Sequence, residues 1–168
     1  IVGSTYVALT SGSSGTLQVM PGASSSLTVD GRLEIRSGGH VIVGSQTTDY
    51  GTLTVTNNTQ VNGGTLTVDW QMNTDSSNSR TSINNGGKLE GEGSIYGNVV
   101  INAGGTISPG LRGFALTTYG NLVFTAGGTY TWNLKDNSTS LGQAGKDYDQ
   151  INVRTATPGN GKLDLDLL

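Results

Sequence analysis

Residues 51–68 read GTLTVTNNTQVNGGTLTV and contain the pentapeptide Gly-Thr-Leu-Thr-Val twice, at 51–55 and at 64–68. In both copies leucine and valine alternate with threonine, and such alternation is typical of a short strand with one buried face. Asn57, Asn58 and Gly63 lie between the copies, and Gly63 forms a Gly-Gly pair with Gly64, the first residue of the second copy. Asparagine and glycine tolerate the positive φ angles of tight corners. The stretch therefore predicts two short strands joined through corners.

The same unit, a small residue followed by alternating polar and apolar residues, recurs along the whole chain. Further copies lie at 15–19, 25–29, 31–35, 39–43, 87–90, 99–101, 105–107, 120–124, 128–132, 150–153 and 163–167. The stacked inward rows of such strands are expected to contain Leu53, Leu66, Leu89, Val99, Ile107 and Leu122. No stretch shows helical spacing, so the sequence predicts an all-β fold.

Many short alternating strands suit a sandwich, a barrel or a solenoid. Hairpins need two-residue turns between matched strands, whereas a solenoid needs a small residue at each corner and one apolar pair on each side of a coil. The chain follows the second pattern, which predicts a β-helix (solenoid) with about eight coils of roughly 20 residues. Residues 69–80 and 135–147 lack clear alternation and are predicted as loops.

Composition excludes several classes of function. The 168 residues include 9 Lys and Arg against 12 Asp and Glu, a net charge of −3, without a basic cluster that could neutralise a phosphate backbone. A nucleic acid partner is therefore not expected. The chain has no cysteine, which excludes disulfides and thiolate metal sites. It shows no signal peptide and no apolar run long enough to span a bilayer, and we expect a soluble piece of a larger protein.

Residues 89–110, LEGEGSIYGNVVINAGGTISPG, resemble the passenger-associated repeat of autotransporter proteins. The family pattern is G-x-G-[ST]-[IV]-x-G-[ND]-V-x-[IV]-x-x-G-G-x-[IVL]-[SA]-P-G. The strand-like stretches that follow in the family are matched here by residues 120–124, 128–134, 149–153 and 161–165. The resemblance thus covers residues 86–168 and is most specific up to Pro109 and Gly110.

This resemblance implies a right-handed parallel β-helix that forms one domain over residues 1–168. Generic coils would occupy 1–85, and the repeat with C-terminal folding coils 86–168. It also implies type V secretion from a Gram-negative bacterium, with an outer-membrane β-barrel translocator C-terminal to Leu168. The same repeat occurs in large surface proteins without a recognised barrel. The largest apolar side chains of the second half, Phe114, Phe124, Tyr130 and Trp132, predict that the C-terminal half is the more stable.

No residue of the sequence is assigned a catalytic, cofactor-binding or metal-binding role, and the binding residues stay unassigned. His40, the only histidine, lies in an alternating strand and is expected on its outward face, without the G-x-S-x-G motif of a serine hydrolase. The close pair Asp147 and Asp149 is read as a solvated corner, and Asp149 matches a structural aspartate of the resembled family. Five other carboxylates are scattered along the chain: Glu34, Glu90, Glu92, Asp164 and Asp166.

Three weaker possibilities stay open. Asp69 and Asp75 could hold a surface cation. The outward threonines of 51–55 and 64–68 could form ladders of the kind some ice-binding solenoids use. Tyr130 and Trp132 are expected to fill or cap a coil, with a sugar-stacking platform as the alternative.

The residue pattern together with the family resemblance implies a non-enzymatic, secreted or surface-displayed β-helical passenger fragment that acts as an adhesin or structural stalk. Its C-terminal coils would template folding and export, and its partner would be a host or cell-surface glycan or protein. No cofactor is expected. The alternative is a glycan-binding or glycan-cleaving β-helix, such as a phage tailspike, a lyase or a lectin-like module.

Overall fold

The computed structural model of the chain describes residues 3–7, 13–19, 25–45, 50–74, 78–110, 114–134, 147–154 and 163–165. All regular structure in these residues is β-strand, without any helix. The strands form three sheets, and every pairing between named strands is parallel.

Each sheet takes every third strand of the chain. Sheet I contains β1 (Thr5–Val7), β4 (Leu33–Arg36), β7 (Thr59–Asn62), β10 (Arg80–Ile83), β13 (Asn98–Ile101), β16 (Leu122–Phe124) and β19 (Leu163–Leu165). Sheet II contains β2 (Gly15–Val19), β5 (Gly39–Val43), β8 (Thr65–Val68), β11 (Lys88–Gly91), β14 (Thr106–Pro109) and β17 (Thr129–Tyr130). Sheet III contains β3 (Ser26–Val29), β6 (Thr52–Val55), β9 (Gln71–Thr74), β12 (Ser94–Tyr96), β15 (Leu116–Tyr119) and β18 (Ile151–Arg154).

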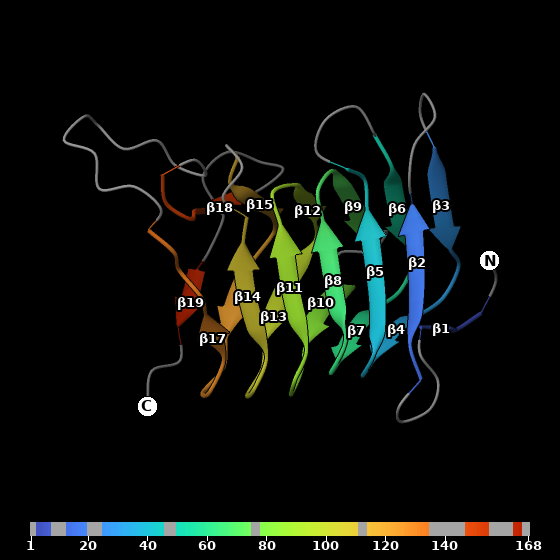
Figure 1. Cartoon of the computed structure of the whole chain (residues 1–168), viewed down its shortest axis with the longest axis horizontal. Helices are drawn as coiled ribbons and strands as arrows, with labels where there is room; N and C mark the ends of the chain where they lie inside the picture. Colours follow the sequence, from blue (N-terminus) through green and yellow to red (C-terminus); the bar gives the residue numbers. More distant parts are fainter. Residues whose placement is uncertain are drawn as a thin grey trace.

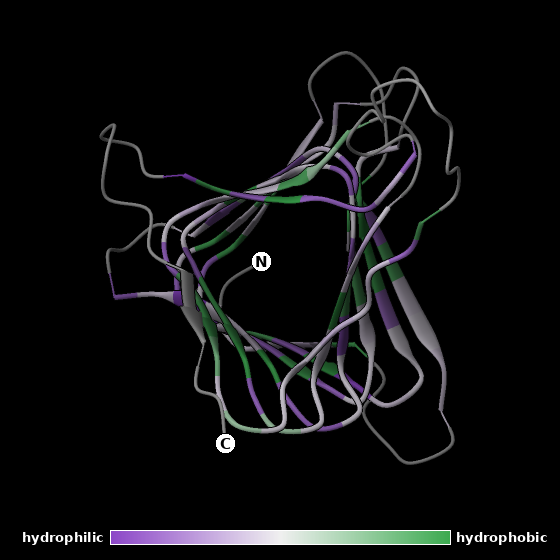
Figure 2. Cartoon of the chain, turned by 90° about the vertical axis from the view of Figure 1, so that its left-hand side faces the viewer, coloured by the Kyte–Doolittle hydropathy of each residue, from purple (hydrophilic) through white to green (hydrophobic). Residues whose placement is uncertain are grey.

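The chain visits the three sheets in turn, so each circuit is one coil of a solenoid. In Figure 1 it advances from right to left, climbs along the nearer strands of sheet II and returns behind them, which is a right-handed winding. Viewed along the axis, the sheets form the sides of a triangular prism (Figure 2). The expected all-β parallel β-helix is confirmed.

Most coils are longer than the expected length of roughly 20 residues. The length of a coil is the number of residues between register partners on neighbouring coils. This length is 18 residues from Thr81 to Val99 but 41 residues from Leu122 to Leu163. Strands β1 to β18 therefore make six coils, and β19 begins another. The pattern of short strands did not reveal how much chain lies between them, so the expected eight coils were too many.

Inward side chains stack in rows along the axis. One row of sheet I contains Val7, Ile35, Val61, Ile83, Ile101 and Phe124. The predicted core residues Leu53, Leu66, Leu89, Val99, Ile107 and Leu122 are at most 1% exposed. Each such side chain contributes about 1.5–3 kcal/mol by leaving water. The predicted core is confirmed.

Glycine pairs form the corner between sheets I and II, and Gly86-Gly87 shows why. Gly86 has a φ of +72°, which favours a residue without a side chain. At Gly87 a Cβ atom would overlap the carbonyl oxygen of Val61 on the preceding coil. The equivalent pairs are Gly38-Gly39, Gly63-Gly64, Gly104-Gly105 and Gly127-Gly128.

One of the two loop predictions was wrong. The predicted loop at 69–80 contains strand β9, whose Met72 is fully buried. A single apolar residue among polar ones gives no alternation to detect. Of the second predicted loop, residues 135–146 lie outside the described part of the chain.

Three of the four large apolar side chains expected to stabilise the C-terminal half are not buried, while the greater stability of that half stays a prediction. Phe114, Tyr130 and Trp132 are 69%, 40% and 52% exposed, and of the four aromatic residues only Phe124, at 8%, is buried. Tyr130 pairs in register with Ile107 and covers the end of an inward row. Strand β17 is the last strand of sheet II, so Tyr130 has no further coil of that sheet to pack against in the described residues.

Candidate functional site

A groove runs along the corner between sheets II and III, at the upper edge of Figure 1 where β8 and β11 pass into β9 and β12. It encloses about 600 Å³. The described residues that line it are Ser45, Tyr50, Asp69, Trp70, Gln71, Glu92, Gly93, Ser94, Tyr96, Phe114, Ala115, Thr117 and Asn152.

Differences in the length of the corner create this groove. Two residues join β8 to β9 and two join β11 to β12, whereas eight join β5 to β6 and six join β14 to β15. The longer connections contribute Tyr50 on one side and Phe114 on the other. The two short corners between them contribute the groove residues Asp69, Trp70 and Glu92.

Aromatic rings line the groove and support one another. Tyr50 and Trp70 meet edge to face with ring centroids 4.4 Å apart, and Tyr96 stacks on Tyr119 with centroids 4.4 Å apart and ring planes 4° apart. Burial, with a smaller contribution from neighbouring Tyr119, raises the pKa of Tyr96. Trp70 and Tyr96 are 41% and 38% exposed, so the rings are both fixed and accessible.

A row of polar side chains crosses sheet III beside these rings. Gln71, Ser94, Thr117 and Asn152 occupy the same position on four successive coils, and all four line the groove. Their amide and hydroxyl groups can donate and accept hydrogen bonds. Successive members are one strand spacing, about 4.8 Å, apart along the solenoid axis.

Two carboxylates from adjacent coils complete the groove. Thr67 and Glu90 are register partners, which places Asp69 beside Glu92 on the next coil. Glu92 is 8% exposed and Asp69 is half-buried. Sequence analysis placed Glu92 among several scattered carboxylates and considered Asp69 as one ligand of a surface cation. Only the coil register brings them together, and Asp75, the other residue of that cation hypothesis, lies outside the described residues.

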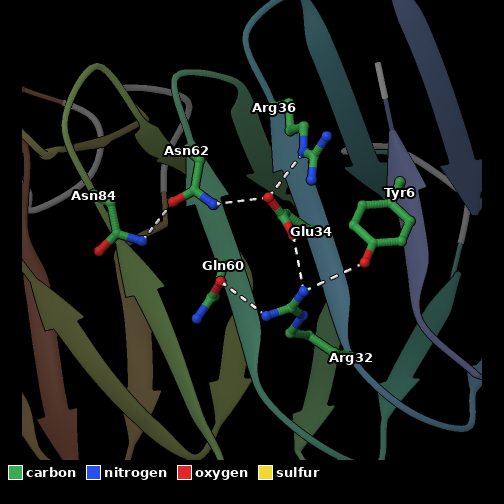
Figure 3. A network of polar contacts seen from close by, with 7 residues as sticks. All are labelled: Tyr6, Arg32, Glu34, Arg36, Gln60, Asn62 and Asn84. Carbon is green, nitrogen blue, oxygen red and sulfur yellow. Dashed lines mark hydrogen bonds and ion pairs between the residues drawn. The ribbon is translucent and has the colours of Figure 1, made fainter. Parts of the chain in front are cut away.

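The outward face of sheet I carries a separate polar network, drawn in Figure 3. Glu34 accepts hydrogen bonds from Arg36 at 2.8 Å, Arg32 at 3.1 Å and Asn62 at 3.1 Å. The side chain of Asn62 accepts one from Asn84 at 2.6 Å, and Asn102 in turn donates to Asn84 at 2.7 Å. These bonds link successive coils and leave Glu34 fully engaged, so the network has a structural role.

Beside this network is a smaller polar hollow of about 260 Å³. Its lining residues are Asn58, Gln60, Arg80, Ser82, Asn84, Val100 and Asn102. None of these lining residues is aromatic, and Asn84 and Asn102 belong to the structural network of sheet I. The groove is therefore the stronger candidate.

His40 lies on the outward face of sheet II, as predicted. Its Nε2 is 3.0 Å from the hydroxyl of Thr67, and that hydroxyl donates to Glu90 at 3.0 Å. Because the hydroxyl has one proton to donate, His40 must donate to it through a protonated Nε2. Lys88 forms an ion pair with Glu90 at 2.7 Å. Nε2 of His40 is thus engaged as a donor and does not serve as a base in this arrangement.

The outward threonines do not form continuous ladders. In sheet II, Thr65 lies between His40 and Lys88, and in sheet III Thr52 lies between Ser26 and Gln71. Side chains of different shape interrupt each row. The regular spacing of hydroxyl groups that an ice-binding face would require is absent from these two rows.

Asp149 is 2% exposed, so the expected solvated corner at Asp147 and Asp149 was wrong for Asp149. Its carboxylate accepts hydrogen bonds from the backbone and side-chain amides of Asn133 at 3.1 and 2.7 Å. Its carbonyl oxygen accepts one from the Trp132 indole at 3.0 Å. Asp149 fastens the segment after β17 to the start of β18, which is a structural role.

Comparisons with protein-family models, curated proteins and solved structures find no match.

The fold is compatible with an autotransporter passenger. In the described ranges no group of three or more His, Cys, Asp and Glu residues is arranged to hold a metal ion. The same ranges contain no helix with the length and apolar character needed to cross a membrane.

Proposed function

We propose that this chain is a β-helical passenger segment that is secreted or displayed on the surface of a Gram-negative bacterium, where it acts as an adhesive stalk without catalysis. The proposal includes an outer-membrane β-barrel translocator C-terminal to residue 168. The partner would be a glycan or protein of a host or of another cell surface.

One observation carries this proposal: the segment that resembles the passenger-associated repeat spans one turn of the solenoid. Residues 89–110 run from β11 to β14, and Leu89, Glu90 and Gly91 pair in register with Ile107, Ser108 and Pro109. The repeat therefore has the length at which its two ends stack. A rod of stacked coils suits a stalk, because each coil contacts only its neighbours and the length scales with the number of coils.

Localisation can be tested on intact cells of the organism that encodes the chain. Antibodies against the purified chain should label unpermeabilised cells or detect the chain in the medium, and external protease should remove the surface signal. A periplasmic protein of the same cells serves as the control. Labelling only after permeabilisation would contradict the proposed export.

The proposed absence of catalysis is supported by hydrogen bonds that already occupy the side chains considered as catalytic candidates. His40 is hydrogen-bonded to Thr67, and Asp149 holds Asn133. Incubation with neutral and acidic polysaccharides should release neither reducing ends nor the unsaturated products of a lyase. Release that disappears in the variants Asp69→Asn or Glu92→Gln would instead identify a glycan-cleaving enzyme.

A further inference from the structure

We propose that the polar hollow on sheet I is a binding site in its own right, which takes one sugar residue that carries a carboxylate. This inference rests on the proposed adhesive function and adds a site and the chemical class of the ligand. The hollow lies over β7, β10 and β13, three neighbouring strands of the sheet. Its shape, its hydrogen-bonding groups and its charge support the inference.

The hollow is formed by a small side chain between larger ones. Gln60, Ser82 and Val100 occupy the same outward position on three successive coils, and Ser82 has the smallest side chain of the three. Arg80, two residues before Ser82, and Asn84, two residues after it, also line the hollow. Its volume of about 260 Å³ is a little below the roughly 300–1,000 Å³ of sites for drug-sized ligands, which suits a single sugar residue.

The polar groups that line the hollow are rich in donors. The side-chain oxygen of Asn58 accepts a hydrogen bond from the backbone N–H of Arg80 at 3.0 Å, and that of Gln60 accepts one from Arg32 at 3.5 Å. The NH₂ groups of both amides can donate, as can the hydroxyl of Ser82 and the guanidinium of Arg80. A surface rich in donors matches a ligand rich in acceptors, and a sugar acid presents carboxylate and hydroxyl oxygens.

Arg80 supplies the charge that selects a carboxylate. Its side chain is exposed, and a guanidinium can bind a carboxylate through two parallel N–H···O bonds. A partner for Arg80 elsewhere in the chain would not prevent this, because an exposed ion pair contributes little stability and a ligand can displace it.

The carboxylate nearest in register to the hollow on the N-terminal side is already balanced. Glu34 lies one coil before Gln60 and forms ion pairs with Arg36 at 2.8 Å and Arg32 at 3.1 Å, as drawn in Figure 3. Two paired cations offset the charge of Glu34, so it repels a carboxylate in the hollow only weakly.

The binding test uses the purified chain and the methyl glycosides of galacturonate, glucuronate and N-acetylneuraminate. The methyl glycosides of galactose and glucose are the neutral probes, and galactose differs from galacturonate only in the carboxylate. We expect at least one acidic probe to bind in an NMR titration about tenfold or more tightly than the neutral probes, because only the acidic probe pairs with Arg80.

Arg80→Gln should weaken the acidic probe about tenfold or more and remove its preference over the neutral probes. Arg154→Gln is the matched control, because Arg154 is also an exposed arginine but does not line the hollow. Its affinity for the probe should equal that of the parent chain. Thermal melts should show that all variants are folded.

Ser82→Val separates a shaped site from a general attraction between opposite charges. Valine would fill the floor of the hollow without changing the charge, and it suits an outward strand position beside Val100. Binding of the acidic probe should therefore be lost in this variant although Arg80 is retained.

Several outcomes would overturn the proposal. These are no binding of any acidic probe, equal affinity for galacturonate and galactose, or an affinity that Arg80→Gln leaves unchanged. Binding that Ser82→Val leaves unchanged would show general attraction by charge and no shaped site. Because the assay does not involve export, its failure is distinguishable from a failure of the cell-surface labelling.

Discussion

Glu34 is the residue with the densest polar contacts on sheet I. Its carboxylate contacts Arg36, Arg32 and Asn62, and the hydrogen bond from Arg36 makes the largest contribution to lowering its pKa below the ordinary 4.5, against the opposing effect of burial. A carboxyl with a lowered pKa binds fewer protons in the folded chain than in the unfolded one. Its contribution to stability is therefore present above pH 4.5 and is lost as the pH falls through the folded pKa.

We predict that Glu34→Gln lowers the free energy of unfolding by about 1–2 kcal/mol at pH 7, because charge-assisted hydrogen bonds to both arginines are lost. At pH 3 the difference between parent and variant should be smaller. Urea titrations at the two pH values measure this, with Asp30→Asn at an exposed position as control. If the parent and the variant differed in free energy of unfolding by the same amount at both pH values, the lowered pKa of Glu34 would not contribute to stability.

Thr59 and Thr81 are polar residues in an inward row that also contains Leu33, Val99 and Leu122. Both are fully buried, they pair with each other in register, and within the described part of the chain neither hydroxyl has a hydrogen-bond partner. A buried hydroxyl without a partner loses its hydration without compensation. Valine has nearly the same shape and no such cost.

Thr59→Val and Thr81→Val should therefore each stabilise the chain, by about 1 kcal/mol. Thermal melts compared with those of Thr106→Val, an outward threonine of sheet II, would measure the gain. The control should change stability little. Destabilisation by either core substitution would show that the hydroxyls have a role in the folded chain.

At the scale of elements, the paired glycines of the corner between sheets I and II make two different demands. Gly86 needs a positive φ but has space, since a Cβ there would come no closer than 3.4 Å to Gly63. Gly87 lacks space, because its Cβ would overlap the carbonyl oxygen of Val61. Asparagine tolerates a left-handed backbone, whereas no side chain relieves an overlap with the backbone.

We expect Gly86→Asn to cost less than about 1 kcal/mol and Gly87→Ala to cost about 2–4 kcal/mol, although alanine is the smaller residue. Denaturant unfolding of the two variants gives the comparison directly. An equal cost would mean that the coils can separate slightly at this corner.

At the scale of the whole molecule, a solenoid loses order coil by coil from a damaged position. Leu122 is 1% exposed and pairs with Val99 on the preceding coil, whereas Leu27 in β3 is only partly buried at the other end of the rod. An unpaired buried carboxylate costs several kcal/mol, which is comparable with the net stability of a domain.

Leu122→Asp is accordingly predicted to abolish folding, whereas Leu27→Asp should leave a protease-resistant core that contains the C-terminal coils. Limited proteolysis with mass spectrometry identifies the protected residues. Equal loss of protection along the chain in both variants would show that the rod unfolds as one cooperative unit, without a C-terminal template.

The sequence by itself determined many of the strands, the glycine corners and the core, but it missed strands such as β7, β9, β10 and β15. The alternation at 51–55 and 64–68 predicts strands β6 and β8 with Leu53 and Leu66 inward, because side-chain direction in a strand depends only on position along it. The Gly-Gly pairs predicted corners because backbone conformation is also local. These local patterns were sufficient for the β-helix and for the outward position of His40.

Only the tertiary structure decided which residues meet across coils. Asp69 and Glu92 lie beside each other because the chain between them makes one circuit, and no local pattern measures a circuit that contains irregular corners. The groove likewise depends on two short corners that lie between two long ones. The burial of Asp149 depends on its contact with Asn133, a residue of a distant segment. Contacts between distant residues depend on the register of whole coils, and that register is set when the coils stack.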